Sequence, residues 1–203
     1  MKLITANLMN ELKDLTEEAV HICWITAFAM KSGVHLMLPT LKKAHERGAE
    51  IQLLVGDYLS ITQPEALRLL LDNLPKAEIR LYQTYGRSFH PKAYLFRHEG
   101  SQHLIVGSSN LSRSALTTGI EWSLHTIELP TFEQSMEEFN RVFYAENTIP
   151  VNQISIDDYE KRYKEANRVM ALSDKWSEAE ETSLMYGTES KVSVAKEQKT
   201  EVT

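Results

Sequence analysis

Two residues capable of chemistry, His90 and Lys92, stand two positions apart in the apolar and aromatic run FHPKAYLF, residues 89–96. If this run is a strand, residues two apart face the same side, so the imidazole and the ammonium project together. Burying a lysine among apolar neighbours is costly unless an anion accompanies it. The pair therefore indicates an anion site, although a lysine at a sheet edge beside a stacked histidine would give the same pattern.

The next strand-like run ends in residues that could bind such an anion. Gly107 allows a tight exit from the strand, and Ser108, Ser109 and Asn110 supply hydroxyl and amide donors. Glu121 lies in a third run, between apolar neighbours that we expect on the opposite face. A nucleophilic imidazole, an ammonium, neutral donors and a carboxylate together suit a phosphate group without metal ligands. Taken alone, Ser108 and Asn110 also fit a turn before a helix, and Glu121 an exposed strand residue.

The elements that must position these residues alternate between helical and strand-like patterns. Apolar spacing predicts helices over residues 7–19, 33–48 and 63–74, and strands over residues 20–29, 50–56 and 77–83. This order of strands and helices predicts parallel strands joined by right-handed crossovers. The runs at 89–96, 103–107 and 120–129 have little helix between them, so we expect part of the sheet to be antiparallel. Late helices are expected over residues 131–147 and 155–172.

The predicted fold is therefore α/β, with a mixed, mostly parallel central sheet flanked by helices on both faces, and a C-terminal helix. We expect one domain over residues 1–172, because 203 residues suffice for one sizeable core and not for two. Residues 173–203 are polar and lack a period, so we expect them to form a flexible, disordered tail.

Composition indicates the cellular compartment of the protein more clearly than its activity. The net charge of −6 argues mildly against a general nucleic-acid binder, but residues 171–203 hold seven acids against four basic residues, which leaves room for a local basic cleft. The single cysteine, Cys23, excludes an internal disulfide and fits a reducing cytoplasm; we expect it to be a small buried strand residue. The N-terminus lacks the apolar region of a secretory signal, and no apolar run is long enough to span a membrane.

The combined motif of HPKAYLF and GSSN resembles the H-x-K and G-S-x-N pattern of the phospholipase D superfamily, over about residues 15–145. With Glu121 eleven residues after Asn110, it is similar to a branch of metal-independent endonucleases that includes a type IIS restriction enzyme. The superfamily's usual aspartate, five residues after the lysine, is Arg97 here. That aspartate is also missing in the endonuclease branch, where the later glutamate occupies the site.

The resemblance implies a DNA endonuclease that hydrolyses phosphodiesters in two steps, without a metal ion or cofactor. One His90 attacks phosphorus to form a phosphohistidine, while a second His90 protonates the leaving oxygen and then activates water. Lys92 and Asn110, with Ser108 and Ser109, would bind the phosphate oxygens, and Glu121 would orient the nucleophile. Because the chain carries one motif, two histidines imply a homodimer with a shared site.

Two alternatives remain open: a phospholipid hydrolase or transferase of the same superfamily, and a non-catalytic, dimerising DNA-binding module. Residues 56–71 are also similar to phospholipase D-like domains ahead of helicase cores; the chain has no Walker A motif, so a helicase could only be a separate partner. His125 could border the site or be a packed strand histidine, and Asp57 could line the cleft or be a turn residue. The other histidines lack metal-ligand spacing.

Overall fold

The computed structural model describes residues 1–166 of the chain. Its strands are β1 (Lys2–Ile4), β2 (His21–Thr26), β3 (Glu50–Gly56), β4 (Glu78–Tyr82), β5 (Lys92–Arg97), β6 (Gln102–Gly107), β7 (Ser123–Thr126) and β8 (Thr148–Pro150). Its helices are α1 (Leu8–Glu18), α2 (Lys31–Glu46), the 3₁₀ turn η1 (Tyr58–Ser60), α3 (Pro64–Asn73), α4 (Arg113–Thr117), α5 (Leu129–Phe143) and α6 (Gln153–Ala166). The predicted boundary at residue 172 and the predicted tail 173–203 lie outside the described residues.

The strands form one eight-stranded sheet in the order β1-β7-β6-β5-β2-β3-β4-β8. The predicted parallel unit is present, because β2, β3 and β4 are neighbours and run in the same direction. The prediction of a mostly parallel sheet is wrong, since the other five pairings are antiparallel. β5 returns into β6 over a connection too short for a crossover, and such connections join only antiparallel strands.

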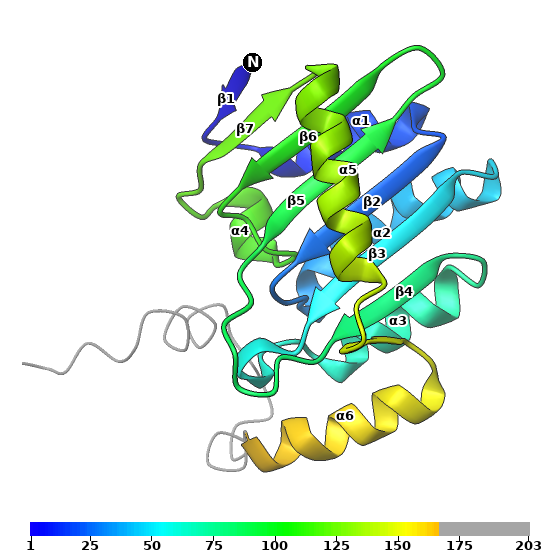
Figure 1. The fold of residues 1–203 in the computed structure, drawn as a ribbon, viewed down its shortest axis with the longest axis vertical. Coiled ribbons are helices and arrows are strands. Elements are labelled where there is room, and N and C mark those ends of the chain that lie inside the picture. The colour runs from blue at the N-terminus through cyan, green and yellow to red at the C-terminus, as the bar shows by residue number, and fades with distance from the viewer. Residues whose placement is uncertain (167–203) are drawn as a thin grey trace, which may run out of the picture. The chain divides into compact units, whose positions relative to one another are not determined.

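Helices cover both faces of the sheet, as the sequence predicts. α1, α2, α3 and α4 lie on one face, and α5 crosses the other (Figure 1). α6 packs against α3 and η1. This three-layer arrangement buries both faces of the central strands.

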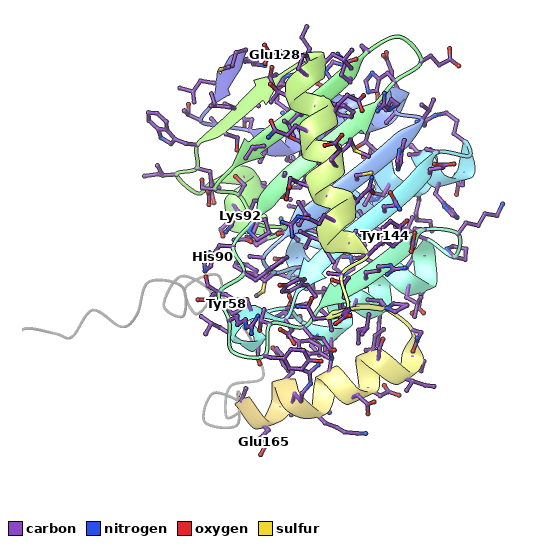
Figure 2. The ribbon with its side chains drawn as sticks, viewed as in Figure 1. Tyr58, His90, Lys92, Glu128, Tyr144 and Glu165 are labelled. Atoms are coloured by element: carbon purple, nitrogen blue, oxygen red, sulfur yellow. The ribbon has the colours of Figure 1, made fainter. Side chains whose placement is uncertain are left out.

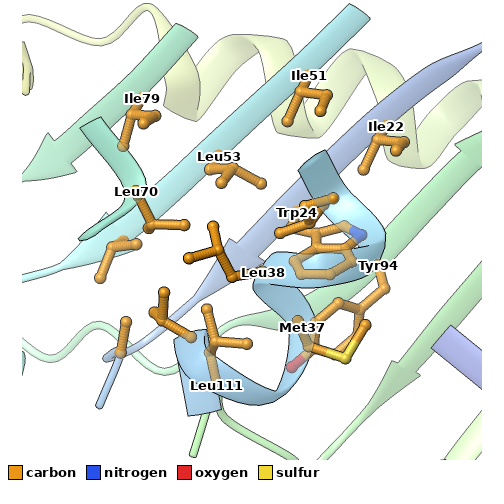
Figure 3. Close-up of a cluster of buried hydrophobic side chains, with 14 of the residues drawn as sticks. Ile22, Trp24, Met37, Leu38, Ile51, Leu53, Leu70, Ile79, Tyr94 and Leu111 are labelled. Carbon is orange, nitrogen blue, oxygen red and sulfur yellow. The ribbon is translucent and has the colours of Figure 1, made fainter. Parts of the chain in front are cut away.

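The main core lies between the sheet and the layer of α1, α2 and α3. Trp24 of β2 packs edge-on against Tyr94 and Phe96 of β5, with ring centroids 5.3 and 6.1 Å apart. Alternate residues of β2 point into this layer, where they meet Met37 and Leu38 of α2 (Figure 3). Because Trp24 and Tyr94 are almost fully buried, the last residues of β2 and the first of β5 are held by close packing.

Two short strands were not predicted. β1 and β8 each contain three residues, and within residues 1–166 each pairs with a single neighbour, β7 and β4 respectively. Three residues are too few to show a period of two in the sequence.

Candidate active site

The residues selected from the sequence gather at one edge of the sheet. β2 and β6 end at this edge and β5 and β7 begin there, because the registers pair Thr26 with Lys92 and Gly107 with Ser123. Figure 2 shows His90 and Lys92 together at this edge, with Tyr58 beside them. The topology therefore brings the histidine-lysine pair, the GSSN turn and the glutamate segment to the same end of the fold.

His90 and Lys92 are in direct contact, although not as the strand pattern predicts. Lys92 is the first residue of β5, whereas His90 lies in the loop before it. Pro91 has no N–H to donate to the ladder, so the strand cannot extend back to His90 as predicted. The Lys92 ammonium lies 3.2 Å from Nδ1 of His90 and donates to the His90 carbonyl oxygen at 2.9 Å. The ring of Tyr58 meets the imidazole edge-on at 4.6 Å between centroids.

The two side chains of this pair differ in their exposure to solvent, since Lys92 is buried and His90 is exposed. Lys92 is only 9% exposed, and burial lowers the pKa of its ammonium, while the nearby carboxylate of Glu121 acts in the opposite direction. Burial, and then the positive charge of Lys92, lower the pKa of His90. Both shifts disfavour the cationic forms, and a phosphate anion bound between the two groups would oppose both shifts.

Asn110 is fixed by the end of β2. Its side chain is buried, and its carboxamide oxygen accepts a hydrogen bond from the Phe28 N–H at 3.4 Å and lies 3.2 Å from the Thr26 hydroxyl. These contacts occupy the oxygen and leave the NH₂ group as the donor available to a ligand. Because Thr26 also pairs with Lys92 in the ladder, Asn110 and Lys92 are attached to the same residue of the scaffold.

Ser108 and Glu121 form a second pair at this edge. The Ser108 hydroxyl donates to the Glu121 carboxylate and accepts a hydrogen bond from the Trp122 N–H at 3.0 Å. The Ser108 N–H donates to the Trp122 carbonyl oxygen, also at 3.0 Å. The prediction that Glu121 lies on a strand is wrong, because Glu121 comes two residues before β7. Its neighbours Ile120 and Trp122 are exposed, so they do not pack on an opposite strand face as predicted. The carboxylate is therefore oriented by the serine.

Ser109 is placed differently from its neighbours in the GSSN turn. It is 1% exposed, and its hydroxyl has no hydrogen-bond partner within residues 1–166. Its carbonyl oxygen accepts a hydrogen bond from the buried Tyr94 hydroxyl at 2.8 Å. The structure thus uses Ser109 to join the turn to the core, and a direct contact between its hydroxyl and a substrate does not fit this placement.

The comparisons with known proteins agree with this architecture. The family model described as "Cardiolipin synthase, PLD-like domain" matches residues 12–143. The chain belongs to the phospholipase D-like family. No curated protein matches the chain significantly.

Solved structures with the phospholipase D-like fold resemble the chain at low sequence identity. NucT from Helicobacter pylori aligns with a TM-score of 0.58 and 16% identity, over 74% of this chain and 98% of NucT. Nuc from Salmonella typhimurium, a phospholipase D family member, aligns with a TM-score of 0.58 and 13% identity, over 75% of this chain and 99% of Nuc. TrmBL2, an archaeal chromatin protein with a novel mode of DNA binding, aligns with a TM-score of 0.51 and 16% identity, over 74% of this chain and 53% of TrmBL2. At these identities the likeness shows the fold.

Sequence reasoning missed Tyr58 and Thr26. Tyr58 stands in η1, whose next two residues, Leu59 and Ser60, have left-handed backbone angles with φ of 51° and 53°. This conformation is unfavourable for residues other than glycine, and it directly follows the residue whose ring contacts the His90 imidazole. No spacing rule points to Tyr58; Thr26 could have been noticed as a polar residue that ends an apolar strand.

Asp57 and His125 prove to be structural. The Asp57 carboxylate is buried, accepts hydrogen bonds from the Thr84 N–H and hydroxyl at 2.8 and 2.7 Å, and pairs with Arg162 of α6 at 2.9 Å. It therefore anchors the turn that carries Tyr58. His125 packs on β7 with its Nε2 3.0 Å from Nδ1 of His103, away from the site edge.

Cys23 is the small buried strand residue that the sequence predicts, and burial raises the pKa of its thiol to about 12. Within the described part of the chain, no three His, Cys, Asp or Glu side chains are grouped so that they could hold a metal ion. None of the helices described is long and apolar enough to cross a membrane.

Proposed function

We propose that the protein is a metal-independent phosphodiesterase that cleaves DNA as an endonuclease, through a phosphohistidine at a site shared by two copies of the chain. The observation that carries this proposal is the state of Lys92. It is buried, and its only hydrogen bonds within residues 1–166 go to His90, with no carboxylate as a direct partner. A buried ammonium without an anionic hydrogen-bond partner is costly, and a phosphate oxygen would supply that partner.

The first chemical step assigns a role to each nitrogen of His90. When Lys92 turns its donors from Nδ1 to a non-bridging phosphate oxygen, Nδ1 is free to carry the ring proton and Nε2 becomes the nucleophile. Nε2 forms a bond to phosphorus as the bond to the leaving oxygen breaks. The His90 imidazolium of the second copy donates its proton to that oxygen.

The second step restores the enzyme. The same second imidazole, now neutral, removes a proton from water, whose oxygen attacks phosphorus as the bond between Nε2 and phosphorus breaks. Lys92 and the Asn110 NH₂ group stabilise the negative charge on the phosphate oxygens in both steps. Glu121, held by Ser108, stabilises the cationic imidazole.

DNA is the substrate that the surroundings favour. Basic residues accompany the site segments along the chain: Lys31 begins α2 shortly after β2 ends, Arg87 is three residues before His90, and Arg113 is three residues after Asn110. All three lie at the surface, where cations can contact successive phosphates of a nucleic acid. The fold of the chain aligns with 98% of NucT and 99% of Nuc.

A phospholipid hydrolase or transferase is the second candidate, because the matching family model carries the description of cardiolipin synthase and because exposed Ile120 and Trp122 flank Glu121. A non-catalytic DNA-binding module is the third, and the fold shared with TrmBL2 supports it. All three candidates would bind a phosphodiester at the same edge, so an activity assay must separate them.

The test is a nicking assay on supercoiled plasmid in EDTA, with wild type and His90→Ala. His35→Ala is the matched control, since His35 is an exposed histidine on α2. We expect nicking by wild type and by the control, and essentially none by His90→Ala. A covalent adduct that is stable in alkali and labile in acid should form only when His90 is present. Binding without cleavage by wild type would favour the DNA-binding module, and cleavage of phospholipid vesicles alone would favour the lipid enzyme.

A further inference from the structure

The side chain of His90 needs support that its own loop does not supply. His90 is exposed and lies in the loop before β5. Within residues 1–166 its imidazole has a hydrogen-bonding contact with the Lys92 ammonium, 3.2 Å from Nδ1, and a ring contact with Tyr58, 4.6 Å between centroids. An exposed side chain can occupy several rotamers, whereas a nucleophile must present one nitrogen to phosphorus. The two contacts are therefore the means by which the imidazole is fixed.

The contact with Tyr58 is the one of these two that can persist when a phosphate binds. In the proposed first step Lys92 turns its donors from Nδ1 to a phosphate oxygen, so the 3.2 Å contact is lost. The ring of Tyr58 meets the imidazole at an angle of 71°, an arrangement that aromatic pairs prefer and that uses no hydrogen bond. In the view of Figure 2, His90 lies between Lys92 and Tyr58.

The backbone that follows Tyr58 has an unfavourable conformation. Leu59 and Ser60 both have left-handed angles, with φ of 51° and 53°. In residues other than glycine such angles persist where the surrounding structure imposes them, and they are frequent at functional sites. Leu59 is 59% exposed, so burial of its side chain does not explain the conformation. The contacts at the two ends of the turn impose it.

Two residues of α6 hold the ends of this turn. At its start, the buried Asp57 carboxylate accepts a hydrogen bond from the Thr84 N–H at 2.8 Å and pairs with Arg162 at 2.9 Å through its other oxygen. At its end, the buried Tyr159 hydroxyl donates to the Thr62 carbonyl oxygen at 2.7 Å. The helix α6 thus fixes the segment between β3 and α3 on both sides of Tyr58.

We propose that Tyr58 is a positioning residue that fixes the His90 imidazole for attack on phosphorus, and that α6 acts on the site by holding Tyr58 in place. The inference rests on the proposed function, because it assigns Tyr58 a role toward the proposed nucleophile. Tyr58 acts through His90 and touches no reacting atom. Its loss should therefore slow the chemical step and should not weaken the binding of DNA, to which Lys92 and Asn110 contribute.

The first experiment compares kcat and KM for plasmid nicking among wild type, Tyr58→Ala, Tyr58→Phe and Tyr144→Ala. Tyr144 is the matched control, because it is also a partly exposed tyrosine and lies well apart from His90 in Figure 2. We expect Tyr58→Ala to lower kcat by about 10–100-fold and to change KM by less than about twofold, since a misplaced nucleophile slows the chemical step. Tyr58→Phe should stay within about twofold of wild type, because the ring contact needs no hydroxyl. Tyr144→Ala should match wild type.

A second measurement follows the titration of the His90 ring by NMR. Burial is the first cause of the lowered pKa of His90, and the ring of Tyr58 lies against the imidazole. Tyr58→Ala should admit water there, so the pKa of His90 should rise toward its ordinary value. The positive charge of Lys92, the second cause, stays in place. Tyr58→Phe should leave the titration unchanged.

The part played by α6 is tested with Arg162→Gln, which removes the ion pair with Asp57. The Arg162 side chain is 44% exposed, so this variant should fold even if Tyr58→Ala does not. Lys161→Gln is its control, because Lys161 lies on the same helix and pairs with the exposed Asp158 at 2.9 Å. We expect Arg162→Gln to lower kcat by about 3–10-fold and Lys161→Gln to leave it unchanged. Addition of Arg162→Gln to Tyr58→Ala should cause no further loss, because both changes act through one contact.

The outcomes separate this inference from the proposed function. If His90→Ala is inactive and Tyr58→Ala keeps the wild-type kcat and His90 titration, Tyr58 is not a positioning residue and the proposed function survives. If Tyr58→Phe is as slow as Tyr58→Ala, the hydroxyl carries the effect and the inference is overturned. If the losses of Tyr58→Ala and Arg162→Gln multiply in the double variant, α6 does not act through Tyr58. If His90→Ala nicks plasmid at the wild-type rate, the proposed function is wrong as well.

Discussion

Replacement of Lys92 by methionine tests the electrostatic role of the site most sharply. Methionine keeps the unbranched apolar stem that packs at the start of β5 and removes only the ammonium. The ammonium of Lys92 is buried without an anionic partner, so its removal should not lower the free energy of unfolding, and the variant should fold. The change therefore isolates the charge from the packing.

The expected loss of activity follows from the position of the ammonium. At about 3 Å from a phosphate oxygen, and with an effective dielectric constant of about 20, the attraction is about 5.5 kcal/mol. Most of this attraction acts on the bound substrate as well, and only the part that grows in the transition state accelerates the reaction. Removal of one such stabiliser typically costs about 3 kcal/mol. We therefore expect Lys92→Met to lower kcat for plasmid nicking by about 10²–10³-fold.

The same variant should change the titration of His90. The positive charge of Lys92 is one cause of the lowered pKa of His90, and the two side-chain nitrogens are 3.2 Å apart. Without that charge the imidazole should bind its proton more readily, so its pKa should rise. Loss of activity in acid, where the nucleophile becomes protonated, should then begin at a higher pH than in wild type.

The assay combines plasmid nicking in EDTA with NMR titration of the His90 ring. Lys43→Met is the control. Lys43 is exposed and lies in the last turn of α2, whereas the first turn of α2 follows the end of β2 at the site. A Lys92→Met variant with a near-wild-type rate and an unchanged His90 titration would refute the electrostatic reasoning and leave Lys92 a structural residue.

Three further predictions follow from the same structure. Nicking should persist in EDTA and should not increase with Mg²⁺, because His90 supplies the nucleophile and Lys92 the positive charge; activity that EDTA abolishes and Mg²⁺ restores would contradict this. Asp57→Ala should lower the free energy of unfolding by about 2–3 kcal/mol in denaturant titration, because the buried Thr84 N–H loses its acceptor; a loss no larger than that of the exposed Glu137→Ala would be the contrary result. Arg87→Gln should weaken DNA binding and make it less dependent on salt in fluorescence anisotropy, whereas an unchanged salt slope would remove Arg87 from the DNA contact.

The sequence predicts the central fold because the parallel unit has long elements with clear periods. The strands β2 and β3 are continuous apolar runs, and the helices between the strands show apolar spacing. The sequence does not show on which side of β2 the later strand β5 pairs, and this pairing is one of the five that are antiparallel. Tertiary packing decides it, since Tyr94 must lie against Trp24.

The sequence predicts which residues form the candidate site better than it predicts how they are arranged. The motif brings His90, Lys92 and Asn110 to one edge, as expected. The period of two does not hold at His90, because Pro91 has no N–H for the ladder and β5 begins only at Lys92. The sequence also does not show which serine of the GSSN turn faces the site. In the structure Ser108 contacts Glu121, and Ser109 is buried in the core. Such differences depend on the turn that follows β6, and the local sequence does not encode its direction.

The central claim is that two copies of His90 act on one phosphate, and mixed dimers test it most directly. Wild type and His90→Ala are mixed in equal amounts under conditions that allow the chains to exchange, and the nicking rate is compared with that of the same amount of wild type alone. Random exchange leaves about a quarter of the dimers with two wild-type chains and about half mixed.

If the site is shared, mixed dimers are inactive, and the rate should fall to about half of the rate before mixing. A larger excess of His90→Ala should drive the rate toward zero. If each chain carries a complete site of its own, the rate should not change at any ratio, and that result would contradict the shared site.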